Sequence, residues 1–177
     1  MIRAQHIHKT YKDLEVLKGV SVTVEKGEVV SIVGASGAGK TTLLHILGTL
    51  DRADNRTDTS LFINNTDIRG LSDKLLAKFR NEHIGFIFQF HQLLPEFTAL
   101  ENICIPALIK GENKRDAERR AMELLSFLQL EARAHHKPNA LSGGEQQRVS
   151  VARALINNPA VVFAEALQPD QKARQLG

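Results

Sequence analysis

The fold of this chain is decided by the stretch Gly34-Ala35-Ser36-Gly37-Ala38-Gly39-Lys40-Thr41. It matches the pattern G-x-x-x-x-G-K-[ST] at every fixed position, after an apolar β-branched run (28–33) and before a helical apolar pattern (41–50). Its three glycines permit positive φ angles and close backbone approach, so that successive N–H groups can point at phosphate oxygens. The helix that follows presents its positive end to the same anion. The stretch therefore predicts a loop that binds a nucleoside triphosphate.

Two side chains at the end of this stretch have chemistry that suits a triphosphate. Lys40 can reach the β- and γ-phosphates, and the hydroxyl of Thr41 can bind Mg²⁺. The alternative interpretation is a glycine-rich turn between a strand and a helix, with an exposed lysine. Because all fixed positions and both flanking elements are present, the sequence favours Mg²⁺ with a nucleoside triphosphate as the ligand.

The composition narrows the class of protein further. A length of 177 residues suits one domain with a core of its own. The net charge is +3, but the Lys and Arg residues are spread along the chain, Trp is absent and Tyr11 is the only Tyr, so no nucleic-acid partner is predicted. Cys104 is the only cysteine, which excludes an intrachain disulfide. No apolar run approaches the roughly 18 residues of a membrane span, so work at a membrane would require docking on other chains.

Strands and helices alternate along the rest of the chain. Antiparallel strands are predicted over 2–11 and 16–25, a central strand over 28–33, and further strands over 61–64, 84–88 and 160–164. Helices are predicted over 41–50, 72–81, most of 98–129 and about 143–156. This order predicts an α/β fold with a mostly parallel sheet and an antiparallel N-terminal β subdomain. We expect one domain over 1–177, with a helical subdomain at about 90–140.

A second anion cradle is predicted in the stretch Leu141-Ser142-Gly143-Gly144-Glu145-Gln146-Gln147-Arg148. A serine followed by two glycines at the start of a helix leaves backbone N–H groups open to a phosphate. The alternative is that Ser142 is a simple N-cap and the glycines form a turn. The complete string favours the cradle over the turn.

The two glycine-rich stretches together resemble the phosphate loop and the signature motif of ABC ATPases. The resemblance implies a P-loop NTPase fold of the ABC type and a homodimer, in which ATP on the phosphate loop of one copy is capped by the signature of the other. Tyr11 matches the aromatic residue that stacks on adenine, although packing at a strand edge is an equally plain role for it. The residues that the resemblance assigns to ATP are Tyr11, Gly34, Ala35, Ser36, Gly37, Ala38, Gly39, Lys40, Thr41, Thr42, Ser142, Gly143 and Gly144.

The same resemblance assigns catalytic and metal-binding residues. Gln89, at the end of the predicted strand 84–88, matches the glutamine that contacts Mg²⁺ or the attacking water. After the strand 160–164 the family has Asp-Glu, whereas this chain has Glu165-Ala166. Either Glu165 is the metal ligand and Ala166 replaces the general base, or Glu165 is the base and the metal ligand is missing. The first alignment needs no gap and is preferred, which gives Thr41, Gln89 and Glu165 as the metal ligands and Gln89 and Glu165 as the catalytic residues.

The stretch from Gly85 to Asn102 is similar to the Lol-type ATPases of lipoprotein-releasing systems, and to their kin in macrolide exporters and cell-division complexes. That similarity implies a peripheral protein at the cytoplasmic face of the inner membrane, bound to membrane-spanning permease subunits. The apolar docking surface would consist of Phe90, Leu93, Leu94 and Phe97, which could equally fill the core of the helical subdomain.

The family pattern covers residues 1 to about 164 and then ends. The switch histidine of the family has no counterpart, since no His follows His136. The sequence therefore predicts a truncated chain that lacks the C-terminal part of the domain. A catalytically defective nucleotide-binding module remains open beside a working exporter ATPase. An ABC ATPase that acts on DNA is disfavoured, because the interval between the two glycine-rich stretches holds no long coiled coil and no Cys pair.

Overall fold

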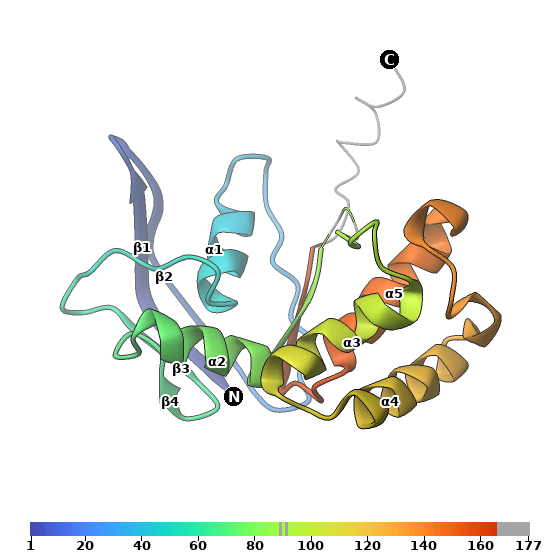
Figure 1. Cartoon of the computed structure of the whole chain (residues 1–177). Helices are drawn as coiled ribbons and strands as arrows, with labels where there is room; N and C mark the ends of the chain where they lie inside the picture. Colours follow the sequence, from blue (N-terminus) through green and yellow to red (C-terminus); the bar gives the residue numbers. More distant parts are fainter. Residues whose placement is uncertain (89, 91, 166–177) are drawn as a thin grey trace, which may run out of the picture. The chain divides into compact units, whose positions relative to one another are not determined.

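A computed structural model describes residues 1–88, 90 and 92–165 of the chain. The chain divides into two compact units, Met1–Ala77 (unit 1) and Lys78–Gly177 (unit 2). Figure 1 labels their helices and strands. Among the described helices, none is both long and apolar enough to cross a membrane.

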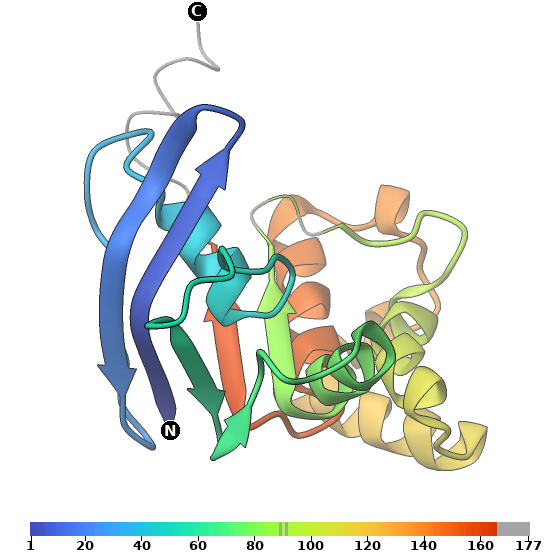
Figure 2. The same cartoon turned by 90° about the vertical axis from the view of Figure 1, so that its left-hand side faces the viewer.

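Unit 1 is built on a four-stranded antiparallel sheet in the order β2-β1-β3-β4, whose long β1–β2 hairpin is plain in Figure 2. The strands are β1 (Ile2–Tyr11), β2 (Leu14–Val24), β3 (Ser60–Ile63) and β4 (Thr66–Asp67). Alternate apolar side chains such as Ile2, Ala4, Leu61 and Ile63 are buried, because successive residues of a strand point to opposite faces. The predicted antiparallel N-terminal subdomain is thus confirmed.

The helix after the glycine-rich loop is α1 (Lys40–Leu47). Leu43, Ile46 and Leu47 are its buried residues, at the spacing of one helical face. It ends earlier than the predicted boundary at residue 50, since Gly48 is its C-cap.

The predicted central strand over 28–33 does not form. This segment has no regular secondary structure, and its side chains Val29 and Val33 are 94% and 85% exposed. β-branched residues favour a strand only when neighbouring strands supply hydrogen bonds and cover the side chains. No strand among the described residues pairs with the segment, so local propensity alone does not hold it extended in a sheet.

Unit 2 pairs β5 (Ile84–Ile87) with β6 (Val161–Ala164) in parallel, with Ile84 opposite Val161 and Ile87 opposite Ala164. Within the described residues, β5 and β6 are the only strands of the predicted parallel sheet that pair in parallel. The helices are α3 (Ala99–Lys110), α4 (Lys114–Phe127) and α5 (Gly143–Leu155), with 3-10 turns η1 (Glu131–Arg133) and η2 (Pro138–Ala140). Helix α2 (Asp73–His83) crosses the division between the units and starts close to its predicted position.

The core of unit 2 lies among α3, α4 and α5, and α5 also packs on β5. Ile103, Ala121, Leu125 and Val149 are fully buried there. Cys104 is buried as well, and burial raises the pKa of its thiol to about 11. A neutral, buried thiol packs like a small apolar side chain.

Candidate functional site

The glycine-rich loop ends at the start of α1, where the backbone is open to an anion. The N-cap is Gly39, no side chain caps the helix, and no acidic residue lies in its first turn. By contrast, α3, α4 and α5 are capped by the side chains of Thr98, Asn113 and Ser142. The first N–H groups of a helix have no partner within it, so those of α1 keep their donor capacity for a phosphate.

The loop geometry requires glycine at two positions for different reasons. Gly37 and Gly39 both have φ near 80°, which strains any residue with a Cβ. A Cβ at Gly37 would meet nothing within 4 Å, whereas one at Gly39 would lie 2.8 Å from Leu17 Cδ2 and 3.1 Å from the carbonyl oxygen of Val16. Gly39 therefore also lets β2 approach the loop closely.

The ammonium group of Lys40 lies against the backbone of the glycine-rich loop. Its ammonium group donates to the carbonyl oxygen of Gly34 at 2.8 Å and to that of Ala35. Both acceptors are neutral, and no described carboxylate forms an ion pair with this lysine. The positive charge therefore stays uncompensated beside the amides at the start of α1, which is the electrostatic setting of a phosphate site.

Tyr11 lies at the end of β1 in the same unit, with 47% of its surface exposed. Its hydroxyl donates to Asp51 Oδ2 at 2.7 Å, and the ammonium of Lys9 lies 5.0 Å from its ring centroid. The hydrogen bond to Asp51, burial and the negative charge of Asp51 together raise the pKa of Tyr11 above its usual value of 10.0. Asp51 is a partner that the sequence pattern does not reveal, because it is 40 residues from Tyr11.

Ser142 caps α5 through a capping box. Its hydroxyl accepts from the Glu145 N–H at 3.3 Å, and its own N–H donates to Glu145 Oε2 at 2.7 Å. The Ser142 hydroxyl also hydrogen-bonds to the Glu145 carboxylate, so its proton is engaged within the cap, and the backbone N–H groups of the first turn are the donors open to a phosphate. A Cβ at Gly143 would meet nothing within 4 Å, which leaves space beside the first turn.

Glu145 makes this helix start sensitive to acid. The carboxylate of Glu145 accepts hydrogen bonds from the backbone N–H and from the side chain of Ser142, and it pairs with Arg133 at 3.0 Å. These contacts, the backbone bond first, lower the pKa of the Glu145 carboxyl to about 2. We expect replacement of Ser142 by alanine to move this pKa back toward 4.5 and to lower the free energy of unfolding at neutral pH. Since the folded-state pKa is depressed, the carboxylate stabilises the fold above pH 4.5 and loses this effect as the pH falls toward 2.

Carbon NMR titration of the Glu145 carboxyl measures this shift directly. Thr98→Ala is the matched control, because it removes the corresponding capping box with Glu101 at the start of α3. It should leave the pKa of Glu145 unchanged. An unaltered Glu145 pKa in Ser142→Ala would contradict the assignment of the cap.

Glu165 follows β6 directly, at the carboxyl end of the parallel pair. Its N–H donates to the carbonyl oxygen of Ile87 at 2.9 Å, which extends the ladder by one bond. Ligands of open α/β sheets bind at this end of the strands. Gln89 and Ala166 lie outside the described residues, so the metal and base alternatives for Glu165 both stay predictions. No group of three or more His, Cys, Asp or Glu side chains in the described part of the chain is arranged to hold a metal ion.

The predicted docking residues divide into two kinds. Phe90, Leu94 and Phe97 are exposed, whereas Leu93 packs partly buried against the core of unit 2. Buried Asn102 holds the backbone beneath them: its side chain accepts from the Leu94 N–H at 2.8 Å and donates to the Leu94, Phe97 and Thr98 carbonyls at 3.0–3.1 Å. A polar residue within the apolar stripe of α3 is the signal that could have revealed this role.

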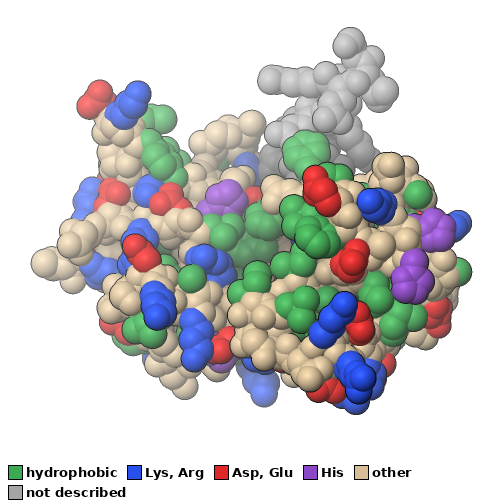
Figure 3. Space-filling view, viewed as in Figure 1, with side chains coloured by type: hydrophobic (Ala, Val, Ile, Leu, Met, Phe, Trp, Pro, Cys, Tyr) green, Lys and Arg blue, Asp and Glu red, His purple; other side chains and the backbone are tan. Residues whose placement is uncertain are grey.

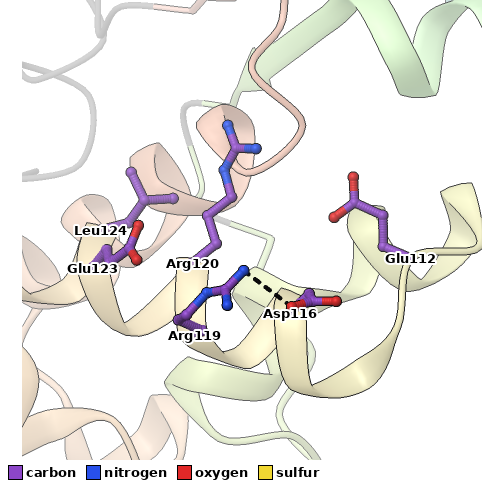
Figure 4. Close-up of a pocket in the computed structure, with 6 residues that line it drawn as sticks. All are labelled: Glu112, Asp116, Arg119, Arg120, Glu123 and Leu124. Carbon is purple, nitrogen blue, oxygen red and sulfur yellow. Dashed lines mark ion pairs between the residues drawn. The ribbon is translucent and has the colours of Figure 1, made fainter.

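On the face seen in Figure 3, hydrophobic side chains gather near the middle of the view, with charged side chains beside them. The pocket in Figure 4 is an open surface of α4 lined by Glu112, Asp116, Arg119, Arg120, Glu123 and Leu124. Arg119 pairs with Asp116 at 3.0 Å there. Three carboxylates and two guanidinium groups line it, so this is a charged helix face with a small excess of negative charge.

Comparison with known proteins agrees with these features. Residues 17–165 match the family model described as ABC transporter. Two ATP-binding proteins of lipoprotein-releasing systems, both named LolD, are each 59% identical over 93% of this chain and 74% of their own length; they come from Porphyromonas gingivalis and Cytophaga hutchinsonii. The dimeric ATP-binding cassette MJ0796, in a post-hydrolysis state with ADP and Pi, superposes with a TM-score of 0.83 at 41% identity, over 99% of this chain and 81% of that one.

These matches confirm the predicted P-loop fold of the ABC type and the resemblance to Lol-type ATPases. The relatives are longer than this chain, which spans about three quarters of their length. With the family model covering most of the sequence, the chain belongs to the ABC transporter family.

Proposed function

We propose that this chain is the ATP-binding subunit of an exporter of the lipoprotein-releasing type, at the cytoplasmic face of the inner membrane. The observation that carries the proposal is the start of α1, which has no side-chain cap, no acidic residue and the Lys40 ammonium held on two loop carbonyls. The names of the relatives support the same reading.

The residues present fit ATP with Mg²⁺. The loop amides and Lys40 bind the phosphates, and the half-exposed ring of Tyr11 stacks on the base. Mg²⁺ takes oxygen ligands and keeps several waters, so a hydroxyl and one carboxylate suffice from the protein. Thr41 supplies the hydroxyl, and Glu165 and Gln89 supply the other oxygens. The metal, when bound, neutralises phosphate charge.

A homodimer completes the nucleotide site. The N–H groups of Gly143 and Gly144 cap the γ-phosphate held by the partner copy, and Ser142 joins them when its hydroxyl turns from Glu145 to the phosphate. The dimeric state of MJ0796, 41% identical, supports this arrangement. Closure of the dimer around ATP is the event that does work on the membrane subunits.

The permease docks on the segment that includes Phe90, Leu93, Leu94 and Phe97. Exposed aromatic and aliphatic side chains on a backbone pinned by Asn102 suit an apolar helix of the permease. Leu93, which packs inward, supports the segment rather than offering contact area. The membrane subunits, and not this chain, select the lipoprotein cargo.

A second candidate is a module that binds ATP and dimerises without turnover. It is favoured by one observation, the alanine at position 166, where the family has its general base. Loss of a general base costs about 10²–10⁴-fold in rate.

Calorimetry of the full chain with Mg·ATP, combined with phosphate release, tests both candidates. We expect saturable binding of one nucleotide per chain and ATP-dependent dimers in analytical ultracentrifugation. Phosphate release at the rate of an intact LolD relative, measured alongside, supports the exporter ATPase; release slower by about 10²-fold or more supports the binding module. Absence of binding at millimolar Mg·ATP in folded protein rejects both.

A further inference from the structure

The carboxylate of Asp51, which follows the C-terminal end of α1, accepts hydrogen bonds from three donors. Oδ2 accepts from the Tyr11 hydroxyl at 2.7 Å, and Oδ1 accepts from the Lys9 ammonium and from the Arg52 N–H, each at 2.7 Å. We propose that Asp51 is a positioning residue for the nucleotide base, which fixes the ring of Tyr11 before ATP arrives. The inference rests on the proposed function, because it takes Tyr11 as the residue that stacks on the base.

Asp51 is itself tied to the helix that carries the phosphate site. Its N–H donates to the carbonyl oxygen of His45 at 3.2 Å, and the neighbouring Leu50 N–H donates to the same oxygen at 2.8 Å. His45 lies in the last turn of α1, whose first turn contains Lys40. The carboxylate is therefore fixed relative to the helix, and the helix relates the base-binding ring to the phosphate-binding loop. Within unit 1, the helix α1 therefore positions both the ring proposed to bind the base and the loop proposed to bind the phosphates.

Lys9 leaves one face of the Tyr11 ring for a ligand. Its ammonium lies over the ring at 5.0 Å from the centroid and also donates to the carbonyl oxygen of Arg52 at 2.7 Å. The Lys9 side chain is only 14% exposed, so this cation is held in place and covers one ring face. Since Tyr11 keeps 47% of its surface exposed, a base can stack on the ring while the cation stays bound.

The energetic role of Asp51 is pre-organisation. An exposed tyrosine ring otherwise samples several rotamers, and a ligand that stacks on it must first select one of them. The hydroxyl hydrogen-bonds with both Asp51 and the Thr42 side chain, and Asp51 has the larger influence on its pKa, so the bond to Asp51 is the main one that selects the rotamer in the free protein. Its loss should weaken base-dependent binding by roughly tenfold, the usual effect of one hydrogen bond to a charged group. Loss of this hydrogen bond should leave the affinity for the phosphates unchanged.

A spectroscopic test is available because Tyr11 is the only Tyr and Trp is absent. Absorbance of tyrosinate near 295 nm during an alkaline titration therefore reports Tyr11 alone, with circular dichroism at each pH to show that the chain stays folded. The wild-type pKa should lie above the usual value of 10.0, and Asp51→Ala should lower it toward that value. Asp51→Asn keeps an acceptor oxygen but no charge, so the Tyr11 pKa in this variant should lie between the wild-type and Asp51→Ala values. Equal titration curves would overturn the proposal.

The binding test compares ATP with inorganic tripolyphosphate, which has no base. We expect Asp51→Ala and Tyr11→Phe each to lower the affinity for ATP by roughly tenfold and to leave the affinity for tripolyphosphate unchanged. In a Tyr11→Ala background, Asp51→Ala should cause no further loss. Asp54→Ala is the matched control, because Asp54 accepts from neighbouring Thr10 at 2.9 Å and not from Tyr11.

The outcomes separate this inference from the proposed function. Equal weakening of ATP and tripolyphosphate in Asp51→Ala would make Asp51 a purely structural residue and overturn the inference, as would an Asp51→Ala effect that persists without the Tyr11 ring. Wild-type protein that binds neither ligand would reject the proposed function itself. Wild-type protein that binds ATP, with no change in Asp51→Ala, would reject only the inference.

Discussion

Replacement of Lys40 by alanine is expected to lower the affinity for Mg·ATP by about a hundredfold or more. The ammonium is held over the loop by the carbonyl oxygens of Gly34 and Ala35, where it meets no compensating carboxylate among the described residues. A charged hydrogen bond contributes about 1.5–3 kcal/mol, and each 1.4 kcal/mol corresponds to a factor of ten. Titration of a fluorescent ATP analogue measures the change.

The control for this variant is Lys18→Ala, which removes an equal charge from an exposed position of β2 in the same unit. It should bind the analogue as the wild type does, since long-range charge effects are screened by salt. A thermal melt of both variants shows that the fold is retained. Equal binding by Lys40→Ala and the wild type would remove Lys40 from the site and leave the phosphate loop without its main cation.

Replacement of Gly85 by alanine is expected to destabilise unit 2 by about 3 kcal/mol, the upper end of ordinary overpacking costs. A Cβ at this position of β5 would lie 2.5 Å from the carbonyl oxygen of Ala154 in α5 and 3.2 Å from Pro159 Cγ. The obstacle is backbone, which cannot rotate away as a flexible side chain could. Strand and helix would have to separate, and the core around α5 would loosen with them. Urea unfolding, followed by circular dichroism, measures the loss.

Gly143→Ala is the matched control for overpacking. A Cβ there would meet nothing within 4 Å, and the position opens a helix, where alanine is tolerated better than glycine. Its free energy of unfolding should equal or slightly exceed that of the wild type. If Gly85→Ala unfolded at the wild-type urea concentration, the close approach of β5 and α5 would be wrong.

Local patterns in the sequence were enough to locate most elements and the phosphate loop. Helix starts were found from their first residues, as at Ser142, because caps and amphipathic spacing act within a few residues. The glycines at 37 and 39 were likewise identified by the backbone shape that only they adopt easily. The assignments of Gln89 and Glu165 came from family resemblance, and they remain predictions.

Contacts between distant residues decided what the local pattern could not. The run 28–33 has strong strand propensity, but without a paired neighbour among the described residues it stays irregular, since a strand is stabilised by its partners. The sequence determined that this chain has a glycine-lined loop ahead of Lys40, a capped helix at Ser142 and an ABC-type order of elements. Only the tertiary structure brought Asp51 to Tyr11 and Asn102 beneath Leu94, because these bonds depend on how the chain folds back on itself.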